Sequence, residues 1–111
     1  KASATKHDVE VFTEAMQEQN YEKLKGLDPY LADYDRIIAE LKKLPAPPKL
    51  AALHLTYLNL TVAQAGTVRK MRGAESDQIS ALIGLKQYVT IQERFKTLLE
   101  KFLSEFQKAS V

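Results

Sequence analysis

The chain has 111 residues and a mass of 12.5 kDa, a size that allows one small domain. It contains no cysteine, which excludes disulfides, thiolate zinc sites and cysteine nucleophiles, and its net charge of +2 is too small to imply a nucleic-acid partner. An apolar fraction of 45% and a charged fraction of 27% are typical of a folded globular protein. Residues 1–7 are small and polar and predict a flexible N-terminal segment, followed by a single domain over residues 8–111.

The first two helices are predicted from apolar spacing and from proline positions. Helical periodicity over residues 8–20 predicts the first helix. Asp28 and Pro29 predict the start of a second helix, because Asp is a good cap and Pro is tolerated at the first helical position. An apolar stripe follows as far as Leu44, where we expect three prolines to stop the helix: Pro45, Pro47 and Pro48.

A third helix is predicted near residues 49–72, with Gly73 as its C-terminal stop. Ser76 and Asp77 can cap a fourth helix that runs to about Lys108 and is the longest of the four. We expect Gly84 to kink or interrupt this helix. Its second half has the strongest apolar periodicity in the chain, and we expect Phe102 to be almost fully buried among its neighbours. The stripe comprises Phe95, Leu98, Leu99, Phe102, Leu103 and Phe106.

No segment is typical of a strand, and the connections between the four helices are short. The sequence therefore predicts an all-α fold, an antiparallel four-helix bundle. A three-helix variant follows if the first two helices behave as one interrupted helix.

Charge is distributed unevenly along the chain. Residues 1–40 hold five Lys/Arg and nine Asp/Glu, whereas residues 41–111 hold eleven and five. Either the acidic half folds against the basic half, or the basic half forms a surface for an anionic partner. The densest basic cluster, Arg69, Lys70 and Arg72, suits the negative end of a helix dipole, although it could also hold a phosphate or an anionic lipid.

No phosphate loop, dinucleotide fingerprint, nucleophile elbow or zinc-protease motif is present in the sequence. No acidic residue lies between Leu50 and Gly73, so His54 has no carboxylate at helical spacing with which to share a metal. We therefore predict no enzymatic activity, no cofactor and no metal. His54 itself is expected to be a core-edge histidine hydrogen-bonded to a neighbouring helix or to a carbonyl; the alternative is a proton donor or a pH-sensitive contact.

Residues 50–68 contain no charged side chain. The length approaches that of a membrane span, but one His, one Asn, one Gln and three Thr make insertion costly, and we expect no span. One side of this helix carries only small uncharged residues, where a solvent-exposed face should carry Lys and Glu. We predict that this face contacts another helix, either the first helix of the same chain or a second molecule. The predicted partner-binding residues are Ala52, Thr56, Asn59, Ala63 and Gly66.

One short pattern resembles a known group of proteins. Leu44-Pro-Ala-Pro-Pro, followed by Leu50, His54, Leu55, Leu58 and Asn59, is similar to a pattern in small membrane-anchored or secreted helical proteins of bacteria. The pattern covers residues 44–59. The resemblance implies an extracytoplasmic location, periplasmic or at the cell surface, and allows a membrane tether outside this chain. It implies no activity.

The combined prediction is a non-enzymatic helical interaction module that presents helix faces to a protein partner or to itself, with no nucleic acid expected. Two alternatives stay open. One is a bundle that carries an apolar or amphipathic small ligand, with His54, Tyr57 and Thr61 at the cavity wall. The other is a binder of nucleic acid or anionic membrane through the basic C-terminal half.

Overall fold

The computed structural model describes residues 7–110, with side chains to residue 108. The first six residues of the predicted flexible segment lie outside this range. Helices account for the regular structure of the described residues, which contain no strand, and the predicted all-α class is confirmed. In chain order the elements are α1 (Asp8–Gln17), the 3-10 helix η1 (Tyr21–Leu27), α2 (Asp28–Lys43), the 3-10 helix η2 (Pro48–Leu50), α3 (Ala51–Arg72) and α4 (Gln78–Ser110).

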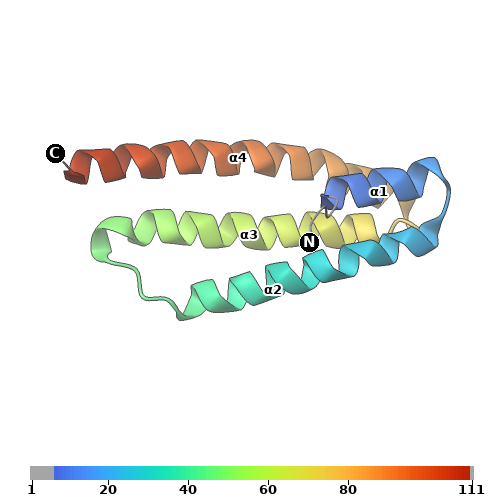
Figure 1. Ribbon diagram of the computed structural model, residues 1–111, viewed down its shortest axis with the longest axis horizontal. Coiled ribbons are helices and arrows are strands. Elements are labelled where there is room, and N and C mark those ends of the chain that lie inside the picture. Colours follow the sequence, from blue (N-terminus) through green and yellow to red (C-terminus); the bar gives the residue numbers. More distant parts are fainter. Residues whose placement is uncertain (1–6, 111) are drawn as a thin grey trace.

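The three long helices run antiparallel in one elongated body of 53 × 29 × 24 Å (Figure 1). Helix α3 packs between α2 and α4. The shorter α1 lies against α3 and α4 over only part of their length. The end of the body that holds η1 and the α3–α4 connection is here called the turn end. The opposite end, with residues 44–50 and the last turns of α4, is called the open end.

The bundle has four helices only at its turn end, because α1 is 10 residues long while α4 has 33. Helix α1 stops at Gln17, three residues earlier than predicted, since Gln19 takes the left-handed conformation with φ 52°. The following η1 was not predicted. Its two buried leucines, Leu24 and Leu27, complete the core at this end.

The core is concentrated at the turn end. Phe12 of α1 is 1% exposed and packs with α3 and α4, whereas Phe102 is 39% exposed. The prediction that Phe102 is almost fully buried is therefore wrong. Its periodicity is that of a core helix, but α1 does not extend far enough to cover it. The buried cluster consists of Phe12, Ala15, Leu24, Leu27, Val68, Met71, Ala74, Ala81 and Tyr88.

Two of the glycines have clear structural roles. Gly73 ends α3 as predicted, its N–H donating to the carbonyl of Arg69 at 3.1 Å. Helix α4 is continuous through Gly84, so the expected interruption is wrong. A Cβ at Gly84 would lie 2.8 Å from Cβ of Lys70 and 3.0 Å from the Thr67 carbonyl oxygen. Glycine is present there because α3 and α4 approach closely.

The helix starts follow the predictions in part. Asp77 caps α4, accepting from the Ser80 backbone N–H at 2.9 Å. Asp28 does not cap α2, because η1 runs directly into α2 and places Leu27 at the cap position. Instead the Asp28 carboxylate accepts a hydrogen bond from Arg72 on α3.

Candidate functional site

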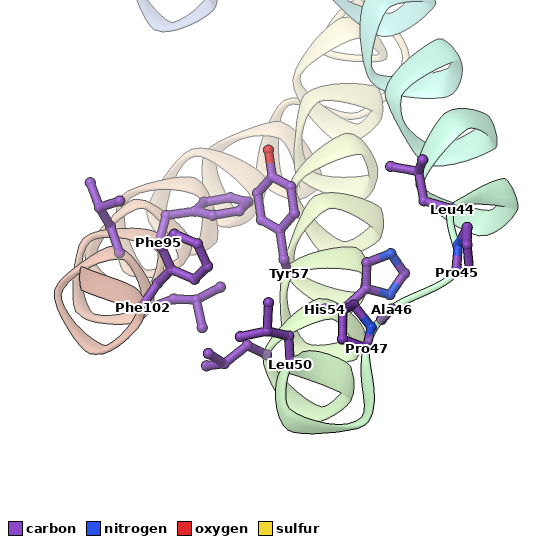
Figure 2. Close-up of a pocket in the computed structure, with 12 residues that line it drawn as sticks. Leu44, Pro45, Ala46, Pro47, Leu50, His54, Tyr57, Phe95 and Phe102 are labelled. Atoms are coloured by element: carbon purple, nitrogen blue, oxygen red, sulfur yellow. The ribbon is translucent and has the colours of Figure 1, made fainter. Parts of the chain in front are cut away.

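An apolar cleft with a volume of about 560 Å³ lies at the open end. In Figure 2, Phe95 and Phe102 of α4 lie on one side, Leu44 and Pro45 on the other, and Tyr57 and His54 of α3 between them. The cleft is lined by Leu44, Pro45, Ala46, Pro47, Leu50, Leu53, His54, Tyr57, Phe95, Leu98, Leu99 and Phe102.

Two features of the chain create the cleft. The prolines after Leu44 stop α2 and send an extended connector past the start of α3. Helix α1 begins at Asp8, alongside the buried Tyr88 of α4, and runs from there toward the turn end. The position over α3 that α1 occupies at the turn end therefore holds no described helix at the open end. Among the described residues, the cleft is a fourth-helix position that no helix fills.

The walls of the cleft are almost entirely apolar. Tyr57 and Phe95 pack edge to face, with ring centroids 5.8 Å apart, and this pair joins α3 to α4. The Nε2 atom of His54 is buried and has no hydrogen-bond partner among the described residues. The expectation of a histidine hydrogen-bonded to a neighbouring helix is therefore wrong for this nitrogen. A buried polar atom without a hydrogen-bond partner costs about 1–3 kcal/mol of stability. A bound molecule that forms a hydrogen bond with this nitrogen would remove that cost and bind more tightly.

The predicted small-residue face of α3 lies away from this cleft. Ala52, Thr56, Asn59 and Ala63 are exposed and Gly66 is half-buried. The Thr56 hydroxyl donates to the Ala52 carbonyl at 2.9 Å, within its own helix. Coverage of this face by the first helix is wrong, because α1 packs against Val68 and Met71 on another side of α3. Contact of the face with a second molecule stays a prediction.

The basic cluster at the end of α3 is largely used inside the fold. Arg69 donates to Asp35 at 2.5 Å, and Arg72 donates to Asp28 at 2.7 Å. These pairs join the basic half of the chain to the acidic half, as one of the two charge hypotheses expected. Lys70 instead donates a hydrogen bond to Gln87 and lines a smaller hollow of about 460 Å³ between α3 and α4.

A buried polar cluster that the sequence did not reveal joins α1, α2 and α4. The Asp8 carboxylate accepts from the Tyr34 hydroxyl at 3.0 Å, from the Tyr88 hydroxyl at 2.6 Å and from the Val9 N–H at 3.0 Å. Burial, together with the Asp8 charge, raises the pKa of both tyrosines well above the ordinary value of 10. This cluster holds the N-terminus of α1 in place, and so fixes where the cleft begins.

Within residues 7–110 no three His, Cys, Asp or Glu side chains are placed to hold a metal ion, and no helix has the length and apolar character needed to cross a membrane. The chain matches no protein-family model, and neither the curated proteins nor the solved structures contain a match to it.

Proposed function

We propose that this chain is a non-enzymatic interaction module, and that its cleft receives an apolar helix from outside its own fold. The observation that carries the proposal is the vacant fourth-helix position. It has one wall from α4, one wall from the connector after Leu44 and a floor of α3 side chains. An amphipathic helix laid in such a groove buries its apolar face through side chains at three- and four-residue spacing.

The chemistry of the cleft supports binding rather than catalysis. Its polar groups are one imidazole and one phenol, and neither is paired with a carboxylate among the described residues. Large apolar side chains are exposed at this end of the molecule, including Leu44 and Leu99, at 57% each. Contiguous exposed apolar surface of this kind marks interaction sites in soluble proteins.

Selection of helical peptides tests the proposal. A display library of random helix-forming peptides would be selected on the wild-type chain and counter-selected on Leu99→Glu, which places a charge at the cleft. We expect enriched sequences with apolar residues at three- and four-residue spacing. Their binding should be unaffected by Ile79→Glu, an exposed position at the other end of α4. Failure to enrich, or peptides that bind Leu99→Glu equally well, would contradict the proposal.

A small apolar ligand is the second candidate, favoured by two observations. The cleft volume of about 560 Å³ lies within the range typical of ligand pockets, and the unpaired Nε2 of His54 offers one specific hydrogen bond. Native mass spectrometry of the protein from its source would show a bound small molecule, and His54→Phe would reduce its occupancy. A mass without bound ligand would contradict this second candidate and favour binding of an apolar helix.

We further propose that the module acts outside the cytoplasm. The support is the resemblance of residues 44–59 to small anchored or secreted bacterial proteins, and the absence of cysteine is compatible with it. Detection of a tagged full-length protein in periplasmic or surface fractions would test this location, and recovery in the cytoplasmic fraction would contradict it.

A further inference from the structure

We propose that the hollow of about 460 Å³ between α3 and α4 binds the phosphate monoester group of a small molecule or of a lipid headgroup. This hollow is here called the basic hollow. Lys70 of α3 and Lys86 and Arg94 of α4 bring three positive charges to its lining. It shares no lining residue with the open-end cleft, so it is a second site, independent of the proposed function.

The three cations of the basic hollow have no anionic partner within the described part of the chain. No Asp or Glu lines the hollow, and none of the ion pairs there includes Lys70, Lys86 or Arg94. No carboxylate lies three or four residues from any of them, the spacing at which ion pairs form along a helix. The neighbouring Arg69 differs, because Asp35 of α2 neutralises it. The charge at the hollow is therefore available to an anion from outside the chain.

The donors come from both helices. A Cβ at Gly84 would lie 2.8 Å from Cβ of Lys70, so the glycine lets α3 approach α4 closely at this point. The Lys70 ammonium donates to the side-chain oxygen of Gln87 at 2.9 Å, which holds these two lining side chains together. Because that oxygen accepts from Lys70, the amide NH2 of Gln87 remains as a further donor. Arg94 adds a planar guanidinium, whose N–H groups bind phosphate oxygens in pairs.

A phosphate monoester matches this set of donors in charge and in shape. At neutral pH it carries a charge of about −1.5 to −2 and three strong acceptor oxygens. A carboxylate has a single charge and two oxygens, fewer than the cations present. The volume is typical of small-molecule pockets and leaves room for the organic part of the ester. No aromatic side chain lines the hollow, so it offers no surface for the base stacking used in single-stranded nucleic-acid binding.

Small side chains keep the α3 side of the basic hollow open. Ala63 and Gly66 line it, and a Cβ added at Gly66 would meet no atom within 4 Å. Both residues belong to the small uncharged face that the sequence predicted to bind a partner. In this proposal, that part of the face admits a phosphate group.

Titration with glycerol phosphate, followed by the backbone amide signals in NMR spectra, tests the site. We expect saturable shifts concentrated in residues 63–70 and 86–94. The double variant Lys86→Gln, Arg94→Gln should bind at least about tenfold more weakly, because each substitution removes a charge-assisted contact. Shifts scattered over the whole chain would overturn the inference.

A second double variant controls for net charge. Lys42→Gln, Lys96→Gln also removes two exposed cations, but neither lines the hollow. Its affinity for glycerol phosphate should change less than about twofold, because exposed charges at a distance are screened by salt. Equal weakening in the two double variants would show a general charge effect and would overturn the inference.

A carboxylate placed in the hollow tests the site without removing a cation. Ala63→Glu should abolish binding of glycerol phosphate, because its side chain would take the place of the anion. Ala52→Glu makes the same exchange at another exposed position of the small uncharged face, outside the hollow, and should leave binding unchanged within about twofold. Circular dichroism checks that both variants are folded. Unchanged binding in Ala63→Glu would contradict the site.

Vesicle flotation distinguishes the two sources of the phosphate group. Vesicles of phosphatidylcholine with phosphatidic acid present a monoester on a membrane, whereas phosphatidylcholine alone presents none. Binding to the phosphatidic acid vesicles that is lost in Lys86→Gln, Arg94→Gln would assign a lipid headgroup. Binding of glycerol phosphate without vesicle binding would assign a soluble ligand. If neither probe binds, the inference is wrong, and the proposed function of the cleft is unaffected.

Discussion

The hydroxyl of Tyr88 donates a 2.6 Å hydrogen bond to the carboxylate of Asp8, joining residues 80 positions apart. Tyr34 donates to the other oxygen, so one buried carboxylate connects the first, second and fourth α-helices. Among the described residues no cation is bonded to this carboxylate, and hydrogen-bond donors stabilise its charge. It also lies in the first turn of α1, where the helix dipole favours an anion.

Asp8→Asn should destabilise the fold by about 1.5–3 kcal/mol, because an amide offers one acceptor oxygen to two donating hydroxyls and loses the charge that strengthens both bonds. Urea unfolding followed by circular dichroism measures the loss. Asp33→Asn is the control: Asp33 is exposed and forms a surface ion pair with Arg36, so its replacement should cost less than about 1 kcal/mol. Equal losses for both variants would contradict a special role for Asp8.

Stability should fall steeply above about pH 10. The folded-state pKa values of Tyr34 and Tyr88 are raised above the unfolded value of about 10. Their contribution is therefore complete below pH 10 and is lost as the pH rises toward the folded pKa values. In that range each tyrosine adds a slope of about 1.4 kcal/mol per pH unit. Urea unfolding at several alkaline pH values measures the slope, which should be reduced in Tyr88→Phe.

Replacing a glycine by alanine should lower stability at Gly84 and raise it at Gly66. Gly84→Ala should cost about 1–3 kcal/mol, because the new Cβ meets Lys70 and the Thr67 carbonyl and forces α3 and α4 apart. A Cβ at Gly66 would meet no atom within 4 Å, so Gly66→Ala should gain about 0.5–1 kcal/mol from helix propensity. Thermal unfolding midpoints of the two variants test this. A gain for both would show that the close approach at Gly84 is absent.

Truncating a phenylalanine should reduce stability much more at the turn end than at the open end. Phe12→Ala should cost about 3–5 kcal/mol as a core truncation. Phe102→Ala should cost only about 1–2 kcal/mol, since the side chain keeps much of its contact with water. If Phe102→Ala lowers the free energy of unfolding as much as Phe12→Ala does, the side chain of Phe102 is buried in solution and the open end is not exposed.

The helices could be predicted because their signals are local. Prolines after Leu44, the glycine at 73 and the cap at Asp77 act within one or two turns, and the structure uses them as expected. The 3-10 helix η1 could not be predicted in this way. Its conformation depends on Leu24 and Leu27 packing under α1 and α3, a tertiary contact that no local pattern encodes.

The cleft was missed for a related reason. Apolar spacing shows that a helix has a face to bury but not whether another helix covers it. The stripe through Phe95 and Phe102 has the periodicity of a core helix, yet α1 is too short to reach it. The position at which α1 begins, held at Asp8 by Tyr34 and Tyr88, therefore decides which apolar residues become core and which become cleft. The Asp8 cluster depends on residues far apart in sequence and gave no signal.

The one-sided core also sets a gradient of local stability along the molecule. Every residue of the buried cluster lies at or near the turn end, and residues 51–60 and 92–108 contain no fully buried side chain. Backbone amides in these segments should exchange with deuterium through local opening, well before the amides of residues 64–71 exchange by global unfolding. Recognition would then take place on the half of the molecule that opens most readily. A docked helix would slow exchange there and extend the cooperative unit along the full length of α3.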